Sequence, residues 1–197
     1  MQAVSVFVLA GGRSSRMGSD KALLKLGGKP LITRAVDLAK SITSDIKIVG
    51  DPAKYDLYGP VVDDIFHGRG PLAGIHAALT TSTSDFNLML AVDLPFLNAS
   101  FLEYLLKQAS ASRATVTVPI TGSYYHPLCA VYRKLFVDLA KGALLKKQNK
   151  IDALFCQVNL RSLSEEELAA NGFGPSIFRN LNTEEDWKAA QVEFEGK

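Results

Sequence analysis

A glycine pair followed by a run of basic side chains is the feature of this chain best suited to binding an anion. The pair, Gly11-Gly12, ends an apolar segment, and the residues from there to Lys29 contain five cations against one acid, Asp20. The five cations are Arg13, Arg16, Lys21, Lys25 and Lys29. Glycine lets consecutive backbone N–H groups converge on phosphate oxygens, and Arg and Lys supply positive charge. The segment is therefore predicted to hold a phosphate group, the alternative being a surface loop of solvated cations.

This loop is expected to bind a nucleotide without being a P-loop. A Walker sequence requires G-x-x-x-x-G-K-[ST], whereas Gly18 here is followed by Ser19 and Asp20. We predict that Arg16 and Lys21 neutralise the triphosphate and take part in catalysis. The backbone amides expected around the nucleotide belong to Leu9, Ala10, Gly11 and Gly12.

Carboxylates follow two apolar segments that are typical of strands. Asp93 comes directly after residues 87–92, the strongest candidate for a central strand, and Asp63 and Asp64 come directly after residues 61–62. Ligands of open α/β sheets bind beyond the carboxyl ends of the strands. Proteins hold Mg²⁺ through one or two carboxylates together with phosphates and water. Asp93 is thus predicted to be a metal ligand, the alternative being a solvated acid in a turn.

The elements that must position these residues alternate between strands and helices. Strands are expected over residues 4–9, 45–50, 61–62, 87–92, 115–118, 126–132 and 177–182, and helices over 31–42, 71–79, 101–109 and within 133–156. Asn98 or Ser100 is expected to cap the helix over 101–109. Shorter helices are expected after Ser164 and after the capping box at 183–186. This alternation predicts a three-layer α/β/α fold with a mostly parallel, Rossmann-like sheet.

Length and composition favour one soluble domain over residues 1–197. The chain is 47% hydrophobic and 21% charged, and no apolar run approaches the roughly 18 residues that span a bilayer. A net charge of +2 without an extended basic face gives no reason to expect nucleic acid as a partner. The apolar N-terminal run is better explained as a strand than as a cleaved leader. Cys129 and Cys156 lack metal-type spacing and are expected to be reduced, which fits a cytoplasmic protein.

The available side chains favour group transfer by positioning over covalent catalysis. No G-x-S-x-G motif is present, neither cysteine has an activating neighbour in sequence, and the chain has three His. His126, beside Pro127, is more typical of a structural residue than of a catalytic one. A phosphate-binding loop, cations and carboxylates at strand ends suit phosphoryl or nucleotidyl transfer, in which the enzyme aligns an in-line displacement and stabilises charge.

The same residues resemble a known family. The pattern runs from Leu9 to Gly18 as LAGGRSSRMG and continues through Asp20-Lys21 and Gly28-Lys29-Pro30-Leu31. A second segment, G-P-L-A-G, ends at Gly74. Both are similar to the signatures of the nucleotidyltransferase superfamily, and within it of the MobA-type molybdenum cofactor guanylyltransferases. The resemblance implies the nucleotidyltransferase version of the α/β/α fold.

The resemblance also implies a reaction and its participants. Similar proteins transfer GMP from Mg-GTP to the terminal phosphate of molybdopterin (Mo-molybdopterin) and release pyrophosphate. GTP, molybdopterin and Mg²⁺ are therefore the implied ligands, with other molybdenum cofactor biosynthesis proteins as further partners. The matching positions imply GTP contacts at Leu9, Ala10, Gly11 and Lys21, a nucleotide contact at Asp64 or its neighbour Asp63, and contacts of Asp93 with both GTP and Mg²⁺.

Further positions are carried over from the family's later segments. Asn180 and Asn182 match an N-x-N-T segment near the metal or product, and His126 matches a His-Pro near the second substrate. Gly50 stands where close relatives often have an Asn that contacts the base. This departure leaves a cytidylyltransferase open, or another nucleotidyltransferase acting on a sugar or polyol phosphate. A non-catalytic nucleotide-binding protein is the alternative outside enzymes.

Overall fold

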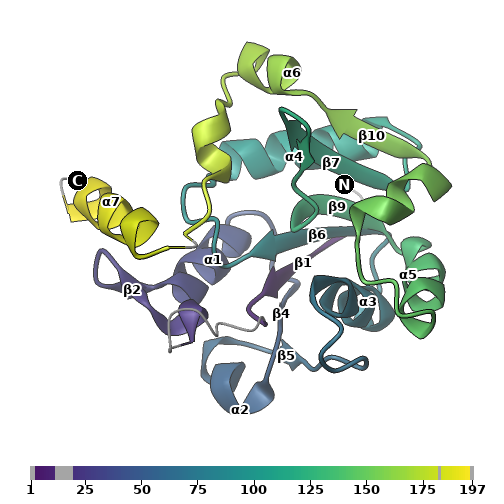
Figure 1. Ribbon diagram of the computed structural model, residues 1–197, viewed down its shortest axis with the longest axis horizontal. Coiled ribbons are helices and arrows are strands. Elements are labelled where there is room, and N and C mark those ends of the chain that lie inside the picture. Colours follow the sequence, from purple (N-terminus) through teal and green to yellow (C-terminus); the bar gives the residue numbers. More distant parts are fainter. Residues whose placement is uncertain (1–2, 12–19, 182, 196–197) are drawn as a thin grey trace.

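A mixed sheet organises the chain in the computed structural model, which describes residues 3–11, 20–181 and 183–195 (Figure 1). Its strands are β1 Val4–Leu9, β4 Ile46–Val49, β5 Val61–Val62, β6 Phe86–Ala91, β7 Val116–Thr121, β8 Tyr124–Tyr125, β9 Cys129–Arg133 and β10 Leu160–Leu163. The strand order is β10-β7-β9-β6-β1-β4-β5, with β8 beside β7. Two further strands, β2 Lys25–Leu26 and β3 Lys29–Pro30, form a separate hairpin.

The four strands nearest the N-terminus in this sheet, β1, β4, β5 and β6, are parallel. Strand β1 pairs in parallel with β4 on one side and β6 on the other, and β4 pairs in parallel with β5. Strand β9 runs antiparallel to both β6 and β7, while β10 is parallel to β7. The mostly parallel sheet predicted from the sequence is confirmed. Its consequence is that β1, β4 and β6 end at the same edge.

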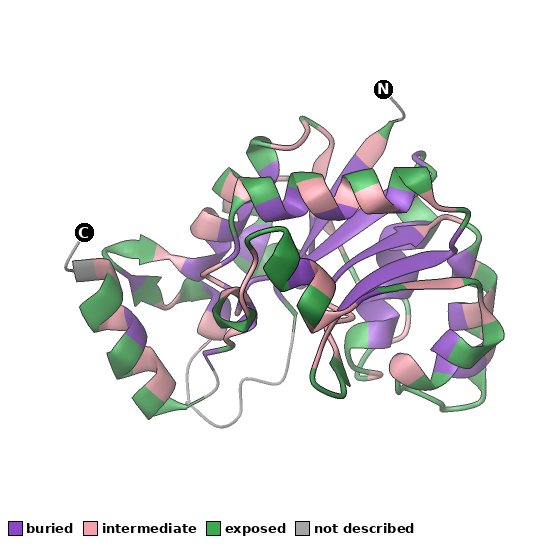
Figure 2. Ribbon diagram, turned by 90° about the horizontal axis from the view of Figure 1, so that it is seen from above, coloured by how far each residue is buried: buried purple, intermediate pink, exposed green. Residues whose placement is uncertain are grey.

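Helices cover both faces of the sheet. They are α1 Leu31–Lys40, α2 Pro52–Tyr55, α3 Pro71–Thr81, α4 Ala99–Ala111, α5 Phe136–Leu145, α6 Glu165–Ala170 and α7 Glu184–Glu195, with 3-10 turns η1 Lys21–Leu23, η2 Asp56–Tyr58, η3 Asp152–Gln157 and η4 Pro175–Phe178. Figure 2 shows buried positions along the central strands and striped helices whose outer side is exposed. This is the three-layer arrangement predicted from the sequence.

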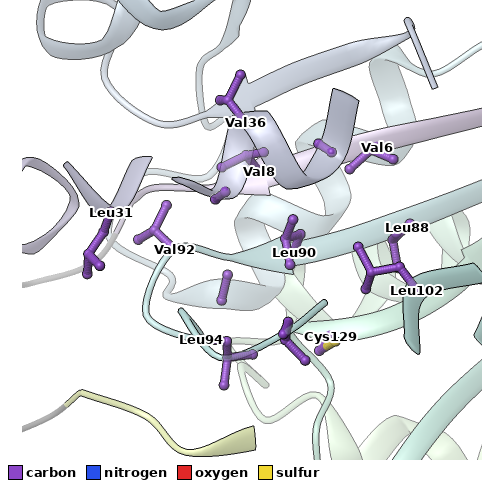
Figure 3. Packing of buried hydrophobic residues seen from close by; sticks show 14 of the residues in the cluster. Val6, Val8, Leu31, Val36, Leu88, Leu90, Val92, Leu94, Leu102 and Cys129 are labelled. Carbon is purple, nitrogen blue, oxygen red and sulfur yellow. The ribbon is translucent and has the colours of Figure 1, made fainter. Parts of the chain in front are cut away.

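Alternate side chains of the central strands pack in two separate hydrophobic cores, one on each face of the sheet. Val8 and Leu90 pack in one core with helices α1 and α4, and Figure 3 shows them there with Val36 and Leu102. Phe7 and its neighbours on the opposite face pack against α3 and α5. A strand buried on both faces needs apolar side chains at every position, which explains the uninterrupted apolar runs of β1 and β6.

Side-chain caps begin three helices at the places where the sequence predicted them. The Asn98 side chain accepts a hydrogen bond from the Phe101 N–H at 2.9 Å, so Asn98 rather than Ser100 caps α4. The Ser164 hydroxyl accepts from the Glu167 N–H at 3.2 Å. Thr183 and Asp186 bond reciprocally at 2.8 and 3.1 Å, as a capping box does.

The strand predicted over residues 177–182 is wrong. The chain forms the 3-10 turn η4 up to Phe178 and has no strand at 179–181, while Asn182 lies outside the described residues. Phe178 is buried and packs edge-on against Phe101, so the apolar residues of this segment fill gaps in the core without pairing in the sheet. The sequence also gave no sign of β10, because a four-residue edge strand with two polar positions lacks an apolar run.

The described part of the chain contains no helix long and apolar enough to cross a membrane.

Leu88→Ala should destabilise the protein strongly, because Leu88 lies on β6 with 0% of its surface exposed. Loss of the side chain removes buried apolar surface and leaves a cavity, at a cost of about 2–5 kcal/mol. Urea denaturation measures this loss as a lower midpoint. The control Leu57→Ala, at a position 93% exposed, should change the free energy of unfolding by no more than about 0.5 kcal/mol. Equal effects of the two substitutions would contradict the assigned core.

Candidate active site

A cleft lies beyond the carboxyl ends of β1, β4 and β6, next to the start of α3. Its volume is about 590 Å³. Its walls come from six segments of the chain: Leu9, Ala10, Gly11, Lys21, Ala22, Val49, Asp64, Gly68, Gly70, Pro71, Gly74, Ala91, Val92, Asp93 and Leu128. In open α/β sheets this is the position at which ligands bind.

The backbone that follows β1 forms part of the cleft wall. The Ala10 and Gly11 N–H groups both donate to the Val49 carbonyl, at 3.0 and 3.2 Å, so the backbone stays beside β4 for two residues beyond the strand. Leu9 pairs in register with Ala91 of β6 on the other side. The backbone from Leu9 to Gly11 is therefore fixed between two strands where it borders the cleft.

Lys21 and Asp93 form an ion pair inside the cleft. The Lys21 Nζ lies 3.1 Å from the Asp93 Oδ2, with 17% and 27% of the two side chains exposed. Lys21 stands on η1, and Asp93 follows β6, where the turn Leu94-Pro95 comes next. Different elements thus position the two residues, and their charged groups lie together in the cleft, where a charged ligand can reach them.

Asp64 brings a second carboxylate to the cleft wall. Its Oδ1 is buried and has no hydrogen-bond partner among the described residues. Burial raises the pKa of the Asp64 carboxyl, and the neighbouring charge of Asp63 adds to this effect. A buried polar atom without a partner is unfavourable unless a ligand or water satisfies it, so Asp64 Oδ1 is an acceptor available to a bound molecule.

Two glycines leave room for a ligand at the start of α3. A Cβ added at Gly74 would lie 3.3 Å from Val49 Cγ1 and 3.7 Å from Asp64 Oδ1, so a side chain there would crowd the cleft wall. Gly70, with φ of 72°, adopts the left-handed conformation that glycine tolerates and turns the chain into Pro71 at the first turn of the helix. The N-terminal end of a helix favours negative charge.

The sequence-predicted site residues fall into three groups. Leu9, Ala10, Gly11, Lys21, Asp64, Gly74 and Asp93 line the one cleft. Gly12, Arg16 and Asn182 lie outside the described residues. Gly50, Asp63, His126 and Asn180 are described but do not line the cleft.

Residues of the third group stand close to the cleft without forming its wall. Asn180 precedes Leu181, whose N–H donates to the carbonyl of the cleft residue Asp93 at 3.3 Å. Asp63 is exposed and its Oδ1 accepts from the Asp64 N–H at 2.8 Å, so it supports the turn that presents Asp64. Gly50 packs behind the cleft, since a Cβ there would lie 2.7 Å from the ring of Tyr55.

His126 has a structural environment. Its ring lies flat on Phe178, with centroids 4.2 Å apart, and its Nε2 is 2.7 Å from the Thr121 hydroxyl. Burial lowers the pKa of its imidazole, which favours the neutral ring. These contacts agree with the structural interpretation of this residue.

Sequence reasoning did not identify several residues of the cleft wall. Ala22, Val49 and Leu128 are apolar, and only the packing of their elements in the folded chain brings them to the cleft. Tyr55 is another omission, because its contact with Asp20 joins segments 35 residues apart. No motif marks such contacts in a single sequence.

A smaller cavity of about 200 Å³ lies between α1 and the end of β6. Its charged groups already have partners: Lys29 pairs with Asp37 at 2.7 Å, and the Arg34 guanidinium donates to the Leu26 carbonyl. It offers no free charge to a ligand, so the larger cleft is the candidate active site.

The cleft can bind a polyphosphate together with a cation. The described residues contain no cluster of three or more His, Cys, Asp or Glu side chains that would hold a metal ion by themselves. Asp93 therefore suits an ion that takes most of its ligands from phosphates and water, as Mg²⁺ does. Lys21 and the N-terminal end of α3 supply positive potential of the kind that phosphates require.

Asp64→Asn should make the protein more stable at neutral pH. A carboxyl with a raised pKa binds more protons in the folded state, so the free energy of unfolding falls as pH rises from the unfolded pKa of about 3.9 through the higher folded value. The variant lacks this dependence. Urea denaturation between about pH 4 and 7 should show its advantage over the natural chain growing with pH and then levelling off. An advantage independent of pH, or a less stable variant, would contradict the assigned burial.

Comparisons with known proteins agree with this geometry. The family model described as the MobA-like NTP transferase domain matches residues 6–160. A probable molybdenum cofactor guanylyltransferase of Carboxydothermus hydrogenoformans is 34% identical over 189 residues, 95% of each chain. Another from Pelotomaculum thermopropionicum is 35% identical over 194 residues, 98% of this chain and 93% of the relative.

A solved structure gives the same result for the fold. The molybdopterin-guanine dinucleotide biosynthesis protein A of Archaeoglobus fulgidus superposes with a TM-score of 0.87 at 27% identity, covering 98% of this chain and all of the other. The resemblance drawn from the glycine-rich loop is confirmed. The chain belongs to the MobA-like NTP transferase family and is a nucleotidyltransferase.

Proposed function

We propose that this protein transfers GMP from Mg-GTP to the phosphate of molybdopterin and releases pyrophosphate. The observation that carries the proposal is the Lys21–Asp93 ion pair at the carboxyl edge of the sheet, in a cleft bordered by backbone of β1. Support for the substrates comes from relatives named as molybdenum cofactor guanylyltransferases that match nearly the whole chain. The reaction would take place in the cytoplasm, within one domain spanning the chain.

The reaction is an in-line displacement at the α-phosphorus of GTP. An oxygen of the acceptor phosphate forms a bond to the α-phosphorus, the bond from that phosphorus to the bridging oxygen of the β-phosphate breaks, and pyrophosphate leaves with the electron pair. Such a transfer needs alignment and charge stabilisation more than covalent assistance from the protein.

Backbone and cationic groups divide this work in the proposal. The backbone of the Leu9–Gly11 segment borders the nucleotide, while Lys21 balances charge on the phosphates. Because charge on the leaving pyrophosphate develops in the transition state, the Lys21 ammonium stabilises that state more than the bound substrate. Arg16, a neighbour in sequence, would add a second cation.

Asp93 is the proposed ligand of Mg²⁺. Its carboxylate stands at the end of β6, is about one quarter exposed and is already oriented by Lys21. The ion supplies charge neutralisation and fixes the geometry of the phosphates when bound. In the absence of nucleotide, Lys21 keeps the Asp93 carboxylate in place and compensates its charge.

Asp64 is the proposed acceptor for a donor group of the nucleotide. Its buried Oδ1 lacks a partner among the described residues and lies beside Gly74, where the absence of a side chain keeps the wall open. A nucleoside brings O–H groups on its sugar, and guanine brings N–H groups as well. Either would satisfy this oxygen.

Asp93→Asn should reduce pyrophosphate release by about 100-fold or more, because the neutral amide is a poor ligand for Mg²⁺ and no longer balances Lys21. The assay contains GTP, Mg²⁺ and Mo-molybdopterin, with folding checked by circular dichroism. The control Asp138→Asn, at an exposed position on α5, should retain the natural rate. An Asp93→Asn variant as active as the control would disprove the role of this carboxylate.

Selectivity for guanine is tested by thermal stability with GTP or CTP in the presence of Mg²⁺. A ligand at about 100 times its Kd should raise the Tm of a chain of this size by about 5–10 °C. We expect this shift with GTP and a smaller one with CTP at the same concentration. A larger shift with CTP would favour a cytidylyltransferase, and no shift with either nucleotide would count against the cleft as a nucleotide site.

A further inference from the structure

The Tyr55 hydroxyl lies within hydrogen-bond distance of acceptors on both chain segments that flank the glycine-rich loop, and its single proton is donated to one of them at a time. Its hydroxyl lies 2.8 and 2.9 Å from the two carboxylate oxygens of Asp20 and 3.2 Å from the carbonyl oxygen of Ala10. Tyr55 ends α2, and 3% of its surface is exposed. It therefore touches the segment entering the cleft from β1 and the segment that leads into η1.

Asp20 receives three donors at this point. Besides Tyr55, the Ala22 N–H donates to Oδ1 at 3.2 Å, and the Lys54 Nζ lies 3.2 Å from Oδ2. The bond from Ala22 makes Asp20 the N-cap of η1. Since η1 carries Lys21, the orientation of Asp20 also determines where the Lys21 backbone stands relative to the cleft.

The tyrosine hydroxyl is suited to permanent donation. Burial raises the pKa of Tyr55, and the nearby Asp20 raises it further, so the hydroxyl stays protonated at neutral pH. A hydrogen bond to an ionised carboxylate is about twice as strong as one between neutral groups. The exposed ammonium of Lys54 contributes less, because solvent screens a half-exposed pair.

The shape of the surrounding backbone is fitted to the tyrosine ring. A Cβ at Gly50 would lie 2.7 and 2.8 Å from two ring carbons of Tyr55, closer than side-chain atoms approach one another. The same Cβ at Gly50 would lie 3.5 Å from the backbone nitrogen of Gly11. Glycine at position 50 therefore makes room for Tyr55 directly behind the cleft wall.

We propose that Tyr55 is a positioning residue for the transfer reaction, acting through Asp20 on Lys21. The chain of contacts runs from the Tyr55 hydroxyl to the Asp20 carboxylate, from there to the Ala22 N–H that begins η1, and from Lys21 on η1 to Asp93. Tyr55 touches neither of the two charged groups at the end of this chain. The inference rests on the proposed function, since it assigns Lys21 a task in phosphate transfer.

Tyr55→Phe tests the proposal, because it removes the hydroxyl and keeps the ring that Gly50 accommodates. Loss of a hydrogen bond to a charged group should lower kcat by roughly tenfold to a hundredfold, with the KM for GTP changed by less than about threefold. A role in folding alone would lower the Tm and leave kcat per folded molecule unchanged. A natural kcat, or a change confined to KM, would overturn the proposal.

Two further variants separate this contact from its surroundings. The control Tyr58→Phe removes a hydroxyl from the adjacent turn η2 that makes no hydrogen bond within the described part of the chain, and it should keep both kinetic constants. Asp20→Asn should lower kcat like Tyr55→Phe. The double variant Tyr55→Phe/Asp20→Asn should be no slower than the slower single variant, since both act through one contact. Additive losses would show independent roles and overturn the proposed route.

A measurement without substrates keeps this proposal distinct from the proposed function. Acetic anhydride labelling followed by mass spectrometry compares the reaction rate of Lys21 with that of exposed Lys25 in the same molecule. In Tyr55→Phe the Lys21 rate should rise severalfold relative to Lys25, and an unchanged ratio would overturn the positioning role. If the natural enzyme makes no guanine dinucleotide, the proposed function fails while this comparison still decides the role of Tyr55.

Discussion

The ion pair between Lys21 and Asp93 depends on most of the molecule and gives the cleft its chemical character. It joins residues 72 positions apart, one on a 3-10 turn after β1 and one in the turn that follows β6. The pair forms because β1 and β6 are parallel neighbours whose ends coincide, with Leu9 opposite Ala91. A partly exposed ion pair contributes little to stability. Its value in this protein is the placement of a cation and a carboxylate within reach of one ligand.

The two cores on either side of the sheet supply the rigidity that this placement needs. Strands β1 and β6 are buried on both faces, so neither can shift its register without exposing apolar side chains. The cleft beyond these strands also contains glycines and three charged side chains, Lys21, Asp64 and Asp93, among its apolar wall residues. Asp64 illustrates the compromise, because its buried Oδ1 has no partner among the described residues, which is unfavourable for folding and leaves an acceptor for a ligand. Rigid strands thus carry a site whose own groups are not optimised for folding.

The sequence predicted those parts of the fold and cleft that depend on local pattern. The apolar runs of β1 and β6 identified the central strands, and the acids that follow β5 and β6 identified Asp64 and Asp93 as residues of the carboxyl edge. Elements determined by tertiary contact could not be predicted in this way. Strand β10 exists because β7 offers it a pairing edge, and residues 177–181 follow the core surface without forming a strand. The contact of Tyr55 with Asp20 likewise arises only when α2 packs beside η1. A side chain at position 50 would clash with the Tyr55 ring, which explains why this position holds glycine, and the resemblance to the family did not suggest that reason.

The most direct test of the proposed site is a crystal structure with α,β-methylene-GTP and Mn²⁺ in place of Mg²⁺, with the metal located by its anomalous signal. A metal peak is expected on the Asp93 carboxylate, with the triphosphate lying between the backbone of Ala10 and Gly11 and the ammonium of Lys21. A metal bound away from Asp93, or a nucleotide bound outside this cleft, would contradict the proposed site.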